Sequence, residues 1–160
     1  MKNNDLTKSF VEKLIDKNLH VCTAESCTGG LVAANIINIS GASAIINESY
    51  ITYSNEAKHR LLGVDENDLE TLGAVSSEVC QQMASGCRIK SGSDIGISTT
   101  GIAGPDGGTD EKPVGTVFIG ISTSKSTKAY ECHFTGDRDE VRKQSVEKAI
   151  ELAYFTIEKI

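Results

Sequence analysis

The sequence contains no tryptophan, only two prolines and three histidines, and fewer basic residues (16) than acidic ones (22). The resulting formal net charge of −6 argues against broad binding to nucleic acids or acidic membranes, because both require a basic surface. A local cationic pocket for a small anion is still compatible with this charge. We therefore expect no nucleic-acid partner and no membrane partner.

The five cysteines form no C-x-x-C pair, and with the three scattered histidines they show no zinc-ligand spacing. We expect free thiols in a reducing compartment and no metal. The N-terminus lacks the apolar core of a signal peptide, and no run approaches the roughly 20 apolar residues of a membrane span. The sequence therefore predicts a cytoplasmic protein, and its 160 residues predict one domain, 1–160.

Hydrophobic periodicity predicts helices and strands that alternate through most of the chain. The expected helices cover residues 5–18, 28–38, 56–62, 65–72, 77–88 and 137–157. The expected strands cover residues 19–25, 44–53, 94–99, 115–123 and 127–135. The last two strands are joined by a connection so short that it implies an antiparallel hairpin. This order predicts a three-layer α/β/α sandwich with a mixed parallel and antiparallel sheet.

The turn at residues 22–30 brings hydroxyls, a thiol, one carboxylate and two glycines to the end of the first predicted strand. Such a turn projects side chains past the carboxyl end of the strand and directs N–H groups of the next helix toward the same place. It suits a nucleophile, an anion, or both. The alternative is a simple helix cap, in which Ser26 or Thr28 satisfies the first helical amides.

A second loop, residues 99–115, contains both prolines and five glycines. A loop of this length in a small domain is usually functional or disordered, and the strands on both sides favour an ordered one. Its glycine-rich backbone can present several N–H groups to an anion. If the strands before the two loops are parallel neighbours, both loops border one crevice.

Serine and lysine are the best-supported catalytic pair near these strand ends. No histidine is close to either loop in sequence, although His20 or His59 could reach them in space, so a Ser-His-Asp triad is poorly supported. A lysine acts as a base only when it is neutral, which requires burial or nearby positive charge. Lys58, in the first turn of a short predicted helix, meets these conditions unless it is merely solvated.

Several further residues are candidates for the same site. Tyr53 could bridge Ser26 and Lys58, and the amides of the turn would supply an oxyanion hole. Cys27 is a rival nucleophile or a buried packing residue. Arg138 is either a phosphate ligand or a solvated side chain, and a solvated helix face is the preferred interpretation for Arg142.

Four segments of the sequence resemble the C-terminal domain of the CinA (competence/damage-inducible) proteins, in order and over nearly the whole chain. They are Ala24-Glu25-Ser26-Cys27-Thr28-Gly29-Gly30-Leu31; Tyr53-Ser54-Asn55-Glu56-Ala57-Lys58 with Leu62-Gly63-Val64; Gly73-Ala74-Val75-Ser76 with Met83-Ala84; and Thr100-Gly101-Ile102-Ala103-Gly104-Pro105 through Lys112-Pro113-Val114-Gly115-Thr116-Val117. The stand-alone form of this domain is a nicotinamide-nucleotide amidase.

The resemblance implies hydrolysis of nicotinamide mononucleotide to nicotinic acid mononucleotide and ammonia, in pyridine-nucleotide salvage, without metal or cofactor. It implies a serine nucleophile at Ser26, a lysine base at Lys58 with Tyr53 beside them, and a homo-oligomer. It places phosphate and ribose contacts on the two glycine-rich loops. The expected substrate contacts are Glu25, Cys27, Thr28, Gly29, Gly30, Thr99, Thr100, Gly101, Gly104, Gly107, Thr109 and Arg138.

A non-catalytic module that binds nucleotides or proteins, linked to competence or DNA damage, is the alternative. The same glycine-rich loops would serve either function. A pure binding module does not need Ser26 and Lys58 together, so this pair discriminates between the two.

Overall fold

Three strands buried along nearly their whole length form the centre of the sheet. They are β1 (Val21–Glu25), β3 (Ile95–Gly101) and β4 (Thr116–Ser122). Runs without polar alternation are typical of strands covered on both faces. The structure, a computed structural model that describes residues 3–160, adds β2 (Tyr50–Ile51) and β5 (Thr127–His133) at the edges, giving the order β2-β1-β3-β4-β5.

The sheet is mixed, as the sequence predicts. β1 pairs in parallel with both β2 and β3, whereas β3 with β4 and β4 with β5 pair antiparallel. The predicted hairpin at the end of the sheet is therefore confirmed. Because β1 and β3 are parallel neighbours, the loops that follow them leave the same edge of the sheet.

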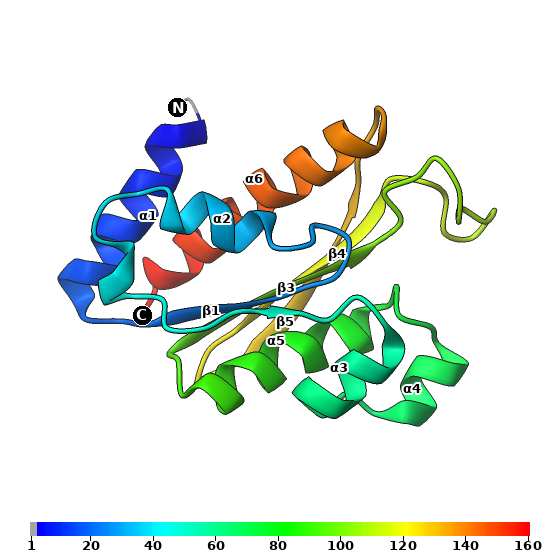
Figure 1. Cartoon of the computed structure of the whole chain (residues 1–160), viewed down its shortest axis with the longest axis horizontal. Coiled ribbons are helices and arrows are strands. Elements are labelled where there is room, and N and C mark those ends of the chain that lie inside the picture. The colour runs from blue at the N-terminus through cyan, green and yellow to red at the C-terminus, as the bar shows by residue number, and fades with distance from the viewer. Residues whose placement is uncertain (1–2) are drawn as a thin grey trace.

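Helices cover both faces of the sheet and complete the three layers (Figure 1). On one face lie α1 (Asn3–Lys17), α2 (Leu31–Ile37) and α6 (Arg138–Ile157). On the other face lie α3 (Asn55–Leu62), α4 (Glu66–Thr71) and α5 (Ser77–Ser91). None of the helices within residues 3–160 combines the length and apolar character needed to cross a membrane.

Each face of the sheet has its own apolar core. The larger core joins α1, α2 and α6 to the sheet through side chains such as Phe10, Val32 and Ile150. The smaller core lies under α3, α4 and α5 and includes Leu62 and Met83. The two helix layers thus hold β1 and β3 rigidly from both sides, and rigid strands fix the positions of the loops at their ends.

The predicted strand over 44–53 is wrong for most of its length. Its first residue ends a short 3₁₀ helix, Ala42–Ala44, and only Tyr50–Ile51 form a strand. Its two ends are tied to β1, since Val21 N donates to Ile45 O and Thr52 N donates to Glu25 O. Between these ties the polar residues 47–49 are exposed, because an edge position leaves them free to stay in solvent.

The predicted helix over 28–38 begins three residues later than expected, at Leu31. Gly29 and Gly30 have φ angles of +62° and +99°, which a right-handed helix does not use. The segment between β1 and α2 is therefore a separate turn, whose amides are not those of a helical first turn.

Candidate active site

The segments that follow β1, β2 and β3 meet at one edge of the sheet and enclose a pocket of about 220 Å³. The register pairs Glu25 with Thr99, and Ser26 N donates to Thr99 O at 2.9 Å, so the turn after β1 lies against the end of β3. The pocket is lined by Ser26, Cys27, Tyr53, Asn55, Lys58, Ala74, Val75, Thr100, Gly101, Ala103 and Arg138.

Lys58 and Ser26 are in direct contact in this pocket, with Lys58 Nζ 3.1 Å from Ser26 Oγ. Lys58 lies in the first turns of α3, which Ser54 caps by accepting from Ala57 N. Side chains of a helix lean toward its N-terminus, so the Lys58 amine reaches back past the cap. There it also donates to Thr52 O (2.9 Å) and Tyr53 O (3.4 Å).

The surroundings of Lys58 favour the neutral amine. The side chain is only 1% exposed, and this burial lowers the pKa of Lys58 below its ordinary value. Within residues 3–160 no carboxylate forms an ion pair with it. A neutral amine has two N–H donors and one lone pair; if the carbonyls of Thr52 and Tyr53 take the two donors, the lone pair is left for the Ser26 hydroxyl.

Tyr53 contributes to the pocket in two different ways. Its carbonyl accepts from Lys58, while its phenol oxygen accepts from Arg138 Nη2 at 3.2 Å. Arg138 also donates from Nη1 to Gly104 O at 2.8 Å, so it joins the second glycine-rich loop to Tyr53. The phenol thus lies on the Arg138 side of the pocket and makes no hydrogen bond to Ser26 within the described residues.

The sequence model of the CinA C-terminal domain family matches residues 3–157. The chain belongs to this family. Curated relatives include two proteins named putative competence-damage inducible protein. The one from Clostridium novyi is 53% identical over 138 residues (86% of this chain, 33% of the relative), and the one from Caldicellulosiruptor saccharolyticus is 48% identical over 155 residues (97% and 38%). The chain thus spans about a third of the length of these relatives.

Solved structures of CinA proteins have the same fold. The competence/damage inducible protein CihA from Agrobacterium tumefaciens superposes with a TM-score of 0.94 at 36% identity, covering 99% of this chain and 96% of that one. A CinA superfamily protein from Klebsiella pneumoniae gives a TM-score of 0.95 at 32% identity and covers both chains completely. The family and the fold that the sequence motifs indicate are therefore confirmed.

About half of the site residues that the sequence predicts line the pocket of this CinA fold. Ser26, Cys27, Tyr53, Lys58, Thr100, Gly101 and Arg138 all line the pocket. Gly104 lies just behind it and contacts Arg138 through its carbonyl. The remaining nominees, Glu25, Thr28, Gly29, Gly30, Thr99, Gly107 and Thr109, do not line it.

Glu25 is an internal anion, which corrects its expected role as a substrate contact. Its carboxylate is buried and accepts from the Thr23 and Thr28 hydroxyls and from the backbone N–H groups of Gly30, Val32 and Ala33. The amides that the sequence assigns to a bound anion are therefore largely occupied by the protein's own carboxylate. Gly29 N is occupied as well, since it donates to Ser26 O at 3.1 Å.

Thr28 and Thr99 belong to the same internal network. Their hydroxyl oxygens are 2.7 Å apart, and the Thr28 hydroxyl donates to Glu25 at 2.6 Å, so Thr99 donates to Thr28. Both side chains are fully buried. They brace the turn after β1 against β3, which is a supporting role for the pocket and not a contact with its contents.

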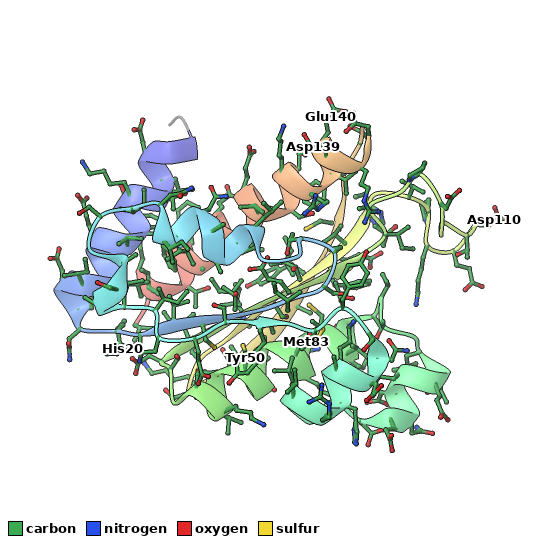
Figure 2. All side chains as sticks on the ribbon, in the orientation of Figure 1. His20, Tyr50, Met83, Asp110, Asp139 and Glu140 are labelled. Atoms are coloured by element: carbon green, nitrogen blue, oxygen red, sulfur yellow. The ribbon has the colours of Figure 1, made fainter. Side chains whose placement is uncertain are left out.

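Gly107 and Thr109 lie on a part of the second loop that extends away from the pocket. Figure 2 shows Asp110 at the far tip of this loop. The tip is closed on itself, because Thr109 N donates to Lys112 O and Lys112 N donates to the Thr109 hydroxyl. Lys112 Nζ donates to Leu72 O at 2.9 Å and so ties the tip toward α4. Within one chain, only the base of the loop borders the pocket.

Cys27 lines the pocket but is poorly suited to act as a nucleophile. Burial raises the pKa of its thiol to about 12, so the reactive thiolate is disfavoured near neutral pH. Ser26, in contrast, has the Lys58 amine in hydrogen-bond contact. This geometry favours the serine of the two candidates.

Arg142 supports the site from outside the pocket, and the expected solvated helix face is wrong for this residue. It donates from Nε to Cys27 O (3.1 Å) and from Nη2 to Thr28 O (3.0 Å), and so holds the turn after β1. The pocket also includes Asn55, Ala74, Val75 and Ala103, which were not nominated. All four belong to the family motifs, which was the only sign of them in the sequence.

Proposed function

We propose that this chain is an amidohydrolase that converts nicotinamide mononucleotide to nicotinic acid mononucleotide and ammonia, with Ser26 as the nucleophile and Lys58 as the base. The observation that carries the proposal is the 3.1 Å contact between Nζ of the buried Lys58 and Ser26 Oγ in the pocket. Family membership supports it, because the motifs that bring these two residues together are family motifs.

In the first step Lys58 takes the Ser26 proton as Ser26 Oγ attacks the carboxamide carbon. This requires the neutral amine, which burial favours. The carbonyls of Thr52 and Tyr53 stabilise the ammonium that forms, since they already accept its other two N–H donors. The base is thus oriented before the reaction and changes only its protonation state during it.

The attack creates an oxyanion that needs nearby donors. Among the described residues, the backbone N–H group of Cys27, which lines the pocket, donates to no other residue, unlike those of Gly29 and Gly30. The Cys27 amide directly follows Ser26, where acyl-transfer enzymes place an oxyanion hole. We assign oxyanion stabilisation to it in place of the glycine amides that the sequence suggests.

The second half of the reaction releases both products. The protonated Lys58 gives its proton to the leaving amino group, so ammonia departs and Ser26 keeps the acyl group as an ester. A water molecule then attacks this ester, Lys58 takes one of its protons and returns it to Ser26 Oγ, and nicotinic acid mononucleotide leaves. One water is consumed and one ammonia is formed per cycle.

Arg138 is the candidate anchor for the substrate phosphate. Of the residues that line the pocket, only Lys58 and Arg138 are cationic, and Lys58 is buried with its amine on Ser26. Arg138 is exposed and uses two of its five N–H donors on Tyr53 and Gly104. The remaining donors suit a phosphate group. An Arg138→Met variant should therefore raise the KM for nicotinamide mononucleotide much more than it lowers kcat.

Ammonia release from nicotinamide mononucleotide tests the proposal, with wild type compared with Ser26→Ala and Cys27→Ala. We expect activity in wild type and Cys27→Ala and a loss of roughly a thousandfold or more in Ser26→Ala. Ser124→Ala, at an exposed serine in the β4–β5 turn, is the matched control and should be fully active.

Each contrary result has a definite meaning. Activity in Ser26→Ala together with its loss in Cys27→Ala would move the nucleophile to the thiol. Wild type that binds nicotinamide mononucleotide but releases no ammonia would favour the non-catalytic binding module. The cytoplasmic location and homo-oligomeric state that the sequence suggests are part of the same proposal and stay predictions.

A further inference from the structure

The nucleophile lies at the start of a tight turn. Gly29 N donates to Ser26 O at 3.1 Å, which closes a β-turn over residues 26–29 with Cys27 and Thr28 in the central positions. The central peptide of such a turn, here Cys27 C=O with Thr28 N–H, is not held by the closing hydrogen bond. Its orientation must be fixed by other contacts.

Arg142 supplies a contact of this kind from outside the turn. Its Nε donates to Cys27 O and its Nη2 donates to Thr28 O, so one planar guanidinium binds two successive carbonyls. In a trans peptide the C=O and N–H groups point in opposite directions. By holding Cys27 O toward α6, Arg142 therefore directs the Thr28 N–H away from α6. Arg142 does not line the pocket and can act on it only through the turn.

We infer that Arg142 is a positioning residue for the proposed hydrolysis: it fixes the central peptide of the Ser26–Gly29 turn and so keeps Ser26 and the Cys27 amide, which lie at the start of this turn, in place beside the pocket. This inference rests on the proposed function for its catalytic part. The two hydrogen bonds from Arg142 to the turn are a property of the folded chain, whether or not the chain turns over a substrate.

The turn has a second restraint, which limits the size of the expected effect. Thr28 has a negative φ, as in a type I turn. Flipping the central peptide to the type II form would demand a positive φ at this β-branched residue. Loss of Arg142 should therefore allow smaller rotations of the peptide and not a complete flip. Because misplaced donors still weaken catalysis, we expect kcat to fall by about 10- to 100-fold.

The test compares Arg142→Met and Arg142→Lys with Lys143→Met as matched control. Lys143 is the adjacent cation on α6, is exposed, and pairs with Asp139 at 2.6 Å, so its loss removes the same charge without touching the turn. In Arg142→Met we expect the fall in kcat with a KM within roughly threefold of wild type. Arg142→Lys should recover much of kcat, because an ammonium can also donate to two carbonyls.

Hydrogen–deuterium exchange at the Gly29 amide, whose hydrogen bond to Ser26 O closes the turn, gives a second readout that does not depend on turnover. Exchange should be at least roughly tenfold faster in Arg142→Met, and unchanged in Lys143→Met, because the turn opens locally more often. Unchanged kcat and exchange in Arg142→Met would overturn the inference. So would a fall in kcat without faster exchange, or an Arg142→Lys variant as slow as Arg142→Met. If wild type releases no ammonia, the proposed function fails, and the exchange measurement alone decides whether Arg142 restrains the turn.

Discussion

Replacing Glu25 by glutamine should destabilise the protein by about 3 kcal/mol, although the two side chains have the same shape. Oε1 of Glu25 accepts from the Thr23 hydroxyl (3.0 Å) and Ala33 N (2.8 Å). Oε2 accepts from the Thr28 hydroxyl (2.6 Å), Gly30 N (2.9 Å) and Val32 N (3.0 Å). Every one of the five neighbours is thus a donor to the carboxylate.

Glutamine cannot satisfy this set in either orientation. With its amide nitrogen at the Oε1 position, the Thr23 hydroxyl can rotate and accept, but Ala33 N–H then faces another donor. An unsatisfied, largely buried N–H costs about 1–3 kcal/mol. Loss of the negative charge from the N-terminal end of α2 adds roughly 0.3–1 kcal/mol. The opposite orientation leaves two backbone amides without an acceptor, so it is the less favourable one.

Urea unfolding measures this difference, with Glu78→Gln as the control. Glu78 lies exposed in the first turn of α5, and its replacement should change the free energy of unfolding by less than about 0.5 kcal/mol. For Glu25→Gln we expect a lower midpoint with an unchanged m-value. A Glu25→Gln midpoint equal to that of Glu78→Gln would refute the assignment of Glu25 as the internal anion of this turn.

The other predictions concern buried polar groups of the site. Burial lowers the pKa of Lys58 from its ordinary 10.5, so ammonia release should rise about tenfold per pH unit until that lowered pKa is passed. Lys58→Arg, which stays protonated, should be inactive throughout, and a flat wild-type profile would contradict this role. The same shift should make the free energy of unfolding increase with pH between the lowered pKa and 10.5, because there the unfolded state binds the additional proton. The Thr52 hydroxyl is buried and has no partner among the described residues, so Thr52→Val should stabilise the fold by about 1 kcal/mol in the same urea assay; a destabilised variant would reveal a partner. Burial raises the pKa of both Cys27, to about 12, and Cys132, but Cys132 is only half-buried, so iodoacetamide should alkylate Cys132 before Cys27, as peptide mass spectrometry would show; equal rates would contradict this.

The local features of the fold were the ones that the sequence could predict. Ser54, Asp65, Ser76 and Asp137 each accept a hydrogen bond from a helical amide three residues on, as their residue types and positions suggest. The β1–β3 crevice also followed from local patterns, because parallel strands bring their carboxyl ends together. The resemblance to the CinA family then indicated which loop residues are part of the site.

The contacts that organise the turn could not be predicted in this way. Arg142 and Thr28 are separated by 114 positions, and nothing in the neighbourhood of Arg142 distinguishes it from a solvated helix residue. The sequence indicates that Glu25 belongs to the turn, but it does not show which donors this carboxylate meets once α2 begins at Leu31. The strand over 44–53 failed for a related reason: its β-branched residues fit a strand, but its exposed polar residues 47–49 interrupt the pairing with β1.

Occupation of the α2 amides by Glu25 determines how a nucleotide would lie in the pocket. A phosphate at the turn after β1 would have to displace a buried carboxylate or lie beside it, and two anions in one site repel each other. In the reaction that we propose, the turn would therefore receive the neutral carboxamide, whose oxygen becomes negative only in the transition state. The phosphate would go to Arg138, which lines the same pocket and has unused donors. The proposal thus assigns the chemistry and the anion binding to different residues, Ser26 and Arg138.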